Sequence, residues 1–207
     1  MGMNSQGHSG TDDYYEKHAL EYFERTVGAD MSPLYDSFLA LVPPGGRILD
    51  AGAGSGRDLR EFVRRGYRCR GIDASPSLAR LAHEYSSAPC DVQRIEELDE
   101  SAAYDGIWAC ASLLHLPKMT LVDALARLHK ALVPLGALFA SVQEGEGEQF
   151  DRSGRFFALY TPSEFLEAAA AAGFAIVRSW RSEDVLRDHV GPRWINVLAR
   201  AGLSAPR

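Results

Sequence analysis

The sequence is poor in cysteine and carries fewer basic than acidic residues. Its 3 cysteines among 207 residues, Cys69, Cys90 and Cys110, are far apart and have apolar neighbours. That arrangement favours reduced structural thiols over a disulfide framework or a zinc site, and we expect no metal. Lys and Arg number 22 against 28 Asp and Glu, a formal charge of −6. The sign is wrong for a chain that covers phosphates, so nucleic acid is not an expected partner.

Long apolar runs are also missing. No segment is apolar over the length that spans a bilayer, and residues 1–13 are polar and lack the apolar core of a signal peptide. We therefore predict a flexible leader over 1–13, no membrane partner and a cytoplasmic location. Hydrophobic residues make up 46% and charged residues 24%, which is typical of a folded globular protein. A chain of this length suits one domain, predicted over 14–207.

Beyond the leader, the hydrophobic pattern alternates between helical and strand-like segments. Apolar residues at three- and four-residue steps predict two helices over 15–23 and 31–42, the second ended by a Pro-Pro-Gly-Gly run. Strands are predicted over 47–51, 68–73, 92–98, 106–111, 137–142, 175–180 and 194–199. Helices are predicted over 58–65, from the N-cap Ser75 onward, over 119–133 and from the Thr161 capping box to Gly173. This alternation predicts an α/β fold with a largely parallel sheet covered by helices on both faces.

One predicted connection, residues 143–160, is long for a loop between a strand and a helix. Its first half is acidic and its second half is aromatic. Long loops inside compact domains are usually functional or mobile, but a solvated excursion explains the acidic half equally well. We expect the aromatic half to be packed.

The most informative motif is a glycine-rich loop after the first predicted strand. It reads Asp50-Ala51-Gly52-Ala53-Gly54-Ser55-Gly56, and such glycines let the backbone turn tightly and approach a ligand. Asp73 ends the second predicted strand, at the distance where an acidic residue accepts hydrogen bonds from both hydroxyls of a ribose. The two features predict a site for a nucleotide-like cofactor, and the paired acid makes a glycine turn without function the weaker interpretation.

The glycine spacing distinguishes between cofactors. Dinucleotide sites use G-x-G-x-x-G around a pyrophosphate. This loop has G-x-G-x-G, preceded by Asp50, which would repel a phosphate and attract a cationic amino-acid group. The pattern resembles the cofactor loop of the class I S-adenosylmethionine-dependent methyltransferases.

The resemblance extends along the chain. Residues 104–117 resemble that family's fourth strand and the loop after it, and Pro134-x-Gly136 resembles the turn into the fifth strand. Arg57-Asp58, residues 108–117 and Tyr14-Tyr15 look most like the tellurite-resistance-type small-molecule branch. The implied fold is a Rossmann-like, doubly wound, mostly parallel seven-stranded sheet with helices on both faces and an antiparallel C-terminal strand. In it, 14–42 would form a helical lid and 43–207 the cofactor-binding sheet.

The resemblance also implies the residues that contact the cofactor. The loop residues wrap the methionine part, Arg57 pairs with its carboxylate, Asp73 binds the ribose, and other residues flank the adenine or lie beneath the sulfonium. Arg94 stands where the family usually has an acid near the adenine. The expected contacts are Asp50, Ala51, Gly52, Gly54, Arg57, Asp73, Ala74, Ser75, Ile95, Glu96, Cys110, Ala111 and Ser112.

Methyl transfer from a sulfonium needs an in-line nucleophile more than it needs acid–base groups. His115 is the candidate base for a hydroxyl or amine acceptor, and a structural hydrogen bond to backbone is its alternative role. Tyr14 and Tyr15, on the first predicted helix, are candidates for ligand contact, with simple packing as the alternative. Arg152 and Arg155 are more simply surface residues than contacts of an anionic substrate.

The predicted function is S-adenosylmethionine-dependent methyl transfer to a small-molecule acceptor. One alternative is a module that binds the cofactor without transferring its methyl. Another is an NAD(P)-dependent reductase, which the glycine spacing disfavours. Reductases of this size use a Tyr with a Lys four residues later, and no lysine here has a tyrosine at that position. The oligomeric state, monomer or homodimer, stays open.

Overall fold

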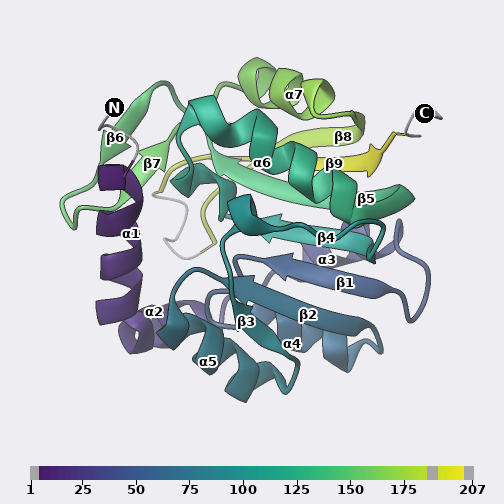
Figure 1. The fold of residues 1–207 in the computed structure, drawn as a ribbon, viewed down its shortest axis with the longest axis horizontal. Coiled ribbons are helices and arrows are strands. Elements are labelled where there is room, and N and C mark those ends of the chain that lie inside the picture. Colours follow the sequence, from purple (N-terminus) through teal and green to yellow (C-terminus); the bar gives the residue numbers. More distant parts are fainter. Residues whose placement is uncertain (1–4, 186–190, 203–207) are drawn as a thin grey trace.

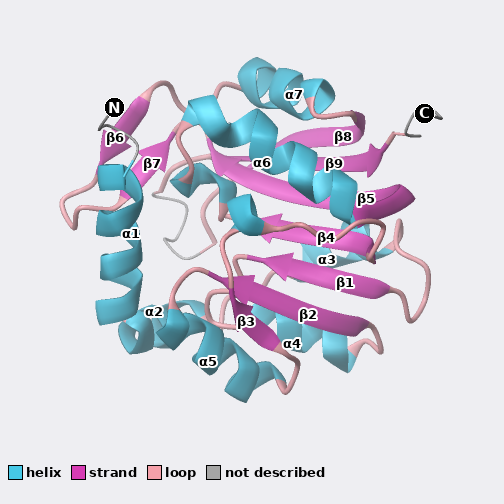
Figure 2. Ribbon diagram, in the orientation of Figure 1, coloured by secondary structure: helices cyan, strands magenta, loops and turns pink. Residues whose placement is uncertain are grey.

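A single seven-stranded sheet forms the centre of the molecule (Figures 1 and 2). The computed structural model describes residues 5–185 and 191–202. The sheet order is β3-β2-β1-β4-β5-β9-β8, and β9 runs antiparallel to both of its neighbours. The strands are β1 (Arg47–Ala51), β2 (Arg68–Asp73), β3 (Cys90–Val92), β4 (Tyr104–Cys110), β5 (Leu132–Gln143), β8 (Phe174–Ser182) and β9 (Trp194–Ala201). The predicted doubly wound, mostly parallel sheet is confirmed.

Helices cover both faces of the sheet, and each face has its own core. On one face lie α3 (Ser32–Leu39), α4 (Arg57–Arg64) and α5 (Pro76–Ser86); on the other lie η1 (Ile95–Glu97), α6 (Lys118–Ala131) and α7 (Pro162–Ala171). On the α3 face, Trp108 stacks on Phe139 with ring centroids 3.9 Å apart and contacts Phe38 and Phe62. None of the helices in the described part of the chain is long and apolar enough to cross a membrane.

The predicted flexible leader is wrong from Ser5 onward, because α1 spans Ser5–Lys17. Long-range contacts hold this Gly- and Ser-rich helix in place. The backbone N–H of Phe156 donates to Thr11 Oγ1 over 2.8 Å, and Asp12 forms an ion pair with Arg94. Composition misled the prediction because tertiary contacts override weak helix propensity. Residues 1–4 lie outside the described residues.

The predicted lid over 14–42 divides into two parts. The helices α1 and α2 (Ala19–Thr26) stand at the carboxyl ends of β1, β2 and β4 (Figure 1). By contrast, α3 buries Tyr35 and Phe38 against the sheet face, where both contact Trp108. That core packing makes α3 part of the sheet layer, so only α1 and α2 remain candidates for a lid.

The strand predicted over 92–98 is also wrong in part. β3 ends at Val92, and residues 95–97 form the 3₁₀ helix η1. Ile95 and Leu98 are both buried, and this three-residue step fits a helical turn, whereas a half-buried strand alternates at two. The side chain of Glu97 accepts the N–H of Arg94 over 3.3 Å and closes the turn.

The long connection 143–160 folds back as a hairpin of β6 (Glu148–Phe150) and β7 (Phe156–Ala158). All three residues of β6 are exposed, whereas Phe156 and Phe157 are buried in the core that includes α6 and α7. The expectation that the aromatic half is packed is confirmed. The hairpin places β7 beside α1 at the edge of the sheet that carries the candidate site.

Candidate active site

The glycine loop after β1 has a backbone that other residues adopt only with strain. Gly52, Gly54 and Gly56 have φ values of 90°, 53° and 74°. A Cβ atom at Gly52 would lie 2.4 Å from the Cβ of Ser112, and one at Gly56 would lie 2.6 Å from the Cα of Ala82 in α5. The first glycine therefore lets the loop lie against the residue after β4, and the third lets α5 pack closely.

Asp73, at the end of β2, holds the other side of this loop. Its carboxylate accepts the N–H of Gly54 and the N–H of Ser75, each over 2.9 Å. Burial raises the pKa of Asp73 to about 6, against the lowering effect of these two hydrogen bonds. A half-buried carboxyl that faces a cavity beside a glycine loop can accept hydrogen bonds from ligand hydroxyls.

A cavity of about 110 Å³ opens between this loop, the end of β4 and α1. We call it the cofactor cavity. Of the predicted site residues it is lined by Tyr15, Gly52, Gly54, Asp73, Ala74, Ile95, Glu96, Cys110, Ala111, Ser112 and His115. It is also lined by residues that were not predicted, Thr11, Asp12, Tyr22, Leu78, Gln93, Arg94 and Leu116. Sequence positions far apart thus meet at one site.

Four predicted residues, Asp50, Ala51, Ser75 and Tyr14, line neither this cavity nor the second one described below. Asp50 is 1% exposed, so it lies behind the loop; burial, with neighbouring Asp58, raises its pKa. Ser75 is buried and caps α5 by accepting the N–H of Leu78. Tyr14 stacks on a neighbouring histidine of the N-terminal helices. Direct contact between these four and a ligand stays a prediction.

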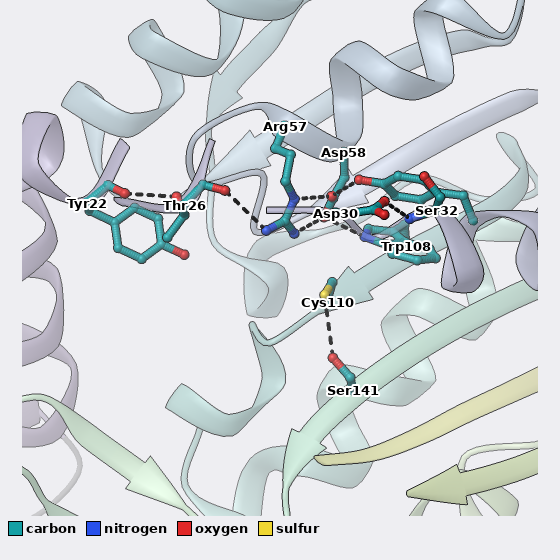
Figure 3. Close-up of polar contacts among 10 residues, drawn as sticks. Tyr22, Thr26, Asp30, Ser32, Arg57, Asp58, Trp108, Cys110 and Ser141 are labelled. Atoms are coloured by element: carbon teal, nitrogen blue, oxygen red, sulfur yellow. Dashed lines mark hydrogen bonds and ion pairs between the residues drawn. The ribbon is translucent and has the colours of Figure 1, made fainter. Parts of the chain in front are cut away.

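A second cavity, of about 270 Å³, adjoins the first. We call it the acceptor cavity, after the role that is proposed for it below. Arg57 lines it, and Figure 3 shows the arginine between the Thr26 carbonyl and Asp58. Asp58 accepts from Arg57 Nε over 2.6 Å and from Arg57 Nη2 over 2.9 Å, and also from the Tyr35 hydroxyl and Trp108 Nε1. Burial alone would raise the pKa of Asp58, but the charge of Arg57 and these hydrogen bonds keep it below its usual value.

The two cavities share a wall. Five residues line both, namely Tyr15, Tyr22, Cys110, Ala111 and His115. Tyr22 covers Gly54, because a Cβ atom there would lie 3.2 Å from the tyrosine ring. The shared wall stands at the carboxyl end of β4, where a parallel α/β sheet usually binds ligands.

Tyr15 and His115 are joined in this wall. The Tyr15 oxygen lies 2.9 Å from His115 Nε2, and His115 Nδ1 lies 2.8 Å from the carbonyl oxygen of Phe156. Because a carbonyl can only accept, Nδ1 carries the imidazole proton and Nε2 accepts from the tyrosine. Burial lowers the pKa of His115 to about 4 and raises that of Tyr15 to about 12. Both groups are therefore neutral at pH 7.

The cysteines are separate free thiols. Burial raises the pKa of Cys69 and of Cys110 to about 12, so neither is a thiolate at neutral pH. Only Cys110 lines the two cavities, where Ser141 Oγ lies 3.6 Å from its sulfur (Figure 3). In the described part of the chain, no group of three His, Cys, Asp or Glu is placed to hold a metal ion.

Fold and site together are those of an S-adenosylmethionine-dependent methyltransferase. The Methyltransferase domain family model matches residues 23–179, and the chain belongs to this family. The chain is 34% identical over 105 residues to a ubiquinone biosynthesis O-methyltransferase of Xanthomonas oryzae pv. oryzae. That match covers 47% of this chain and 43% of the relative, so the chain matches less than half of the relative's length.

Comparison with solved structures also finds methyltransferases. The 1,6-didemethyltoxoflavin-N1-methyltransferase of Burkholderia thailandensis, solved with 1,6-didemethyltoxoflavin and S-adenosylhomocysteine bound, superposes with a TM-score of 0.80 and 25% identity. The superposition covers 98% of this chain and 92% of that one. A methyltransferase of Methanosarcina mazei, 18% identical with a TM-score of 0.74 over 84% of this chain and 100% of that one, shares the fold. The cofactor is S-adenosylmethionine, as predicted, and the reductase alternative is not supported.

Proposed function

We propose that the protein methylates a small molecule that binds in the acceptor cavity. The observation that carries this proposal is the wall of five residues that both cavities share. A cofactor in the first cavity supplies an activated methyl group, and a nucleophile in the second cavity can approach it from the opposite side. Positioning two reactants in line removes most of the entropic barrier to such a displacement.

The residues present fit the predicted cofactor contacts. Asp73 offers a half-buried carboxylate for the ribose hydroxyls, and the missing Cβ atoms of Gly52 and Gly54 leave room for the methionine part. Ile95 and Glu96 line the cofactor cavity and would flank the adenine. Cys110, Ala111 and Ser112 line it at the end of β4 and would lie beneath the sulfonium. Arg57 lines the second cavity and would bind the methionine tail if the tail extends into it.

The Tyr15–His115 pair can take up the proton that the methyl acceptor loses. An acceptor O–H or N–H can donate to the Tyr15 oxygen, whose own proton then moves to His115 Nε2. The Phe156 carbonyl keeps its bond to Nδ1–H and stabilises the imidazolium that forms. Since the pKa of His115 lies near 4, the pair suits acidic hydroxyls, ring N–H groups and thiols better than aliphatic alcohols or amines.

Two further observations support a small acceptor. The acceptor cavity, about 270 Å³, lies near the lower end of the roughly 300–1,000 Å³ of small-molecule sites. One relative is named for ubiquinone biosynthesis, and one solved neighbour is named for 1,6-didemethyltoxoflavin, which is bound in its structure. The tellurite-resistance-type branch, the cytoplasmic location and the lid role of α1 and α2 stay predictions.

The test is to incubate the protein with S-adenosylmethionine and a panel of thiol, hydroxyl, amine and chalcogen oxyanion acceptors. We expect S-adenosylhomocysteine and one methylated product by mass spectrometry, with the Tyr15→Phe variant slower on proton-bearing acceptors. If S-adenosylmethionine raises the melting midpoint but no acceptor is methylated, a binding module without transferase activity is the better interpretation. Stabilisation by NAD(H) alone contradicts the proposal.

A further inference from the structure

One face of the paired strands β5, β9 and β8 carries polar side chains that the methyl-transfer chemistry does not use. In the antiparallel register, Ser141 lies opposite Asn196, and Gln143 lies opposite Trp194. Directly opposite residues point to the same face of a sheet, as do residues two apart along one strand. These four residues and Ser182, which is opposite Trp194 on β8, all line the acceptor cavity. We call the five residues the recognition floor.

The carboxamide of Asn196 has a fixed orientation. Its Nδ2 donates to Ser182 Oγ over 2.9 Å and lies 3.5 Å from the Trp180 carbonyl, which can only accept. The donors of Asn196 thus point toward β8, and its carbonyl oxygen is the group that can accept from a ligand. Asn196 is 1% exposed, so its position is set by packing.

Gln143 supplies the complementary chemistry at the next position of the floor. Its carboxamide carries both donors and an acceptor, and it is half-buried at the end of β5. Trp194 beside it is half-buried, and the buried Phe157 also lines the cavity. Two aromatic side chains in a lining that also carries carboxamides suit a flat ligand with polar edge groups.

Two of the three arginines that line the cavity form ion pairs with aspartates inside the protein. Arg57 is held by Asp58 through two hydrogen bonds of 2.6 and 2.9 Å. Arg155 is held by Asp151, whose Oδ2 accepts from Nε over 2.9 Å and from Nη2 over 2.6 Å. The lining also carries Arg25, Glu183 and Asp184, so its arginines do not outnumber the surrounding carboxylates. The cavity therefore has no excess of positive charge for an anionic acceptor.

We propose that the methyl acceptor is an uncharged planar ring in which an N–H or O–H stands next to a carbonyl group, as in a lactam, an imide or a hydroxy-carbonyl compound. Asn196 and Gln143 bind this edge of the ring. This inference rests on the proposed function of the acceptor cavity. Asn196 Oδ1 accepts the donor of this edge, and the Gln143 carboxamide donates to the ring carbonyl. The group that donates to Tyr15 and takes the methyl is another N–H or O–H of the ring. The two residues set specificity and take no part in moving the methyl group.

The probes are lumazine, a two-ring compound with an imide edge, and 1,3-dimethyllumazine, which keeps the ring system and its carbonyl groups but carries methyl groups in place of the N–H donors. Calorimetry measures their binding to the protein saturated with S-adenosylhomocysteine. We expect lumazine to bind about tenfold more tightly than its dimethyl form, and Asn196→Leu and Gln143→Leu each to weaken lumazine about tenfold. Binding of the dimethyl form should be unchanged in Asn196→Leu. Gln149→Leu, on exposed β6, is the matched control and should change nothing.

The affinity for S-adenosylhomocysteine distinguishes a failure of this inference from a failure of the proposed function. Neither carboxamide lines the cofactor cavity, so the variants should bind S-adenosylhomocysteine as the wild type does. Suppose that S-adenosylhomocysteine binds normally. If lumazine then fails to bind wild type, or binds Asn196→Leu and Gln143→Leu as tightly as wild type, the recognition floor does not set specificity. If the wild type binds no S-adenosylhomocysteine, the proposed function fails and this inference fails with it.

Discussion

Tyr15 donates its phenol proton to Nε2 of His115 over 2.9 Å, although the two residues are 100 positions apart. α1 supplies the tyrosine, the 3₁₀ turn η2 (Leu113–His115) supplies the histidine, and Phe156 in β7 fixes the imidazole through its carbonyl. The peptide N–H of the same Phe156 donates to Thr11 of α1. Helix, turn and hairpin therefore hold one another at the wall between the cavities.

The half-buried His115 should make the fold sensitive to acid. Its pKa is lowered to about 4 in the folded protein, against a usual value near 6.5. The unfolded chain therefore binds more protons between pH 6.5 and 4, and stability is lost as the pH falls through that window. We expect wild type to lose about 2 kcal/mol relative to His115→Gln in the free energy of unfolding, measured by urea titration at pH 7 and pH 4. His18→Gln, at an exposed histidine, is the control, and an equal loss in wild type and His115→Gln would contradict the burial argument.

Asp73 should change the pH dependence of stability in the direction opposite to His115. Burial raises its pKa to about 6, so the folded protein binds the proton more readily than the unfolded chain between pH 3.8 and 6. Its contribution to stability is present at low pH and is lost as the pH rises through that window. Asp73→Asn should therefore steepen the acid destabilisation that His115 causes, and the same urea titrations check it. A shallower pH dependence in Asp73→Asn would reverse the assigned sign.

Asp73 should also control cofactor affinity. Loss of a charged acceptor for two hydroxyls should weaken S-adenosylhomocysteine binding in Asp73→Asn by about 1.5–3 kcal/mol, measured by calorimetry at pH 7.5. In wild type the affinity should fall as the pH drops below about 6, because the proton competes with the ribose for the carboxylate. Asp73→Asn should lack this pH dependence. An unchanged dissociation constant in a folded variant would remove Asp73 from the ribose site.

Local sequence patterns predicted the part of the site that is built from consecutive residues. The glycine loop and Asp73 are separated by one helix, and their roles follow from backbone conformation and strand order. The contacts of Tyr22, Arg155 and Asn196 with the cavities could not be predicted, because they depend on how α2, the β6–β7 hairpin and β9 are placed in space. Ser141 and Asn196 become neighbours only through the antiparallel register of β9.

The third glycine of the loop should matter for stability more than for ligand binding. A Cβ atom at Gly56 would meet three backbone atoms of Ala82 at 2.6 to 3.1 Å, and backbone cannot move aside as a side chain can. Gly66 has a similar φ, 88°, with nothing within 4 Å of the added carbon. Gly66→Ala should cost about 1–2 kcal/mol of backbone strain, and Gly56→Ala should cost clearly more. Thermal or urea unfolding of the two variants checks this, and equal costs would show that α5 can shift.

Arg57 should recognise the carboxylate of the cofactor's methionine part. Asp58, itself bonded to Tyr35 and Trp108, fixes Nε and Nη2 of the arginine and leaves other N–H groups for a ligand. Arg57→Lys keeps the positive charge beside the buried Asp58 but loses the paired donors. It should weaken S-adenosylhomocysteine about tenfold, while 5′-methylthioadenosine, which lacks the amino-acid tail, should change by about twofold or less.

The comparison of the two ligands separates recognition from folding. A variant that disturbs the Asp73 side of the cavity should weaken both ligands equally, since both carry the ribose that Asp73 is predicted to bind. Selective loss of S-adenosylhomocysteine binding is expected if Arg57 contacts the part that only this ligand has. Because Arg57 lines the acceptor cavity and not the cofactor cavity, that result would also place the methionine tail across the boundary between the two.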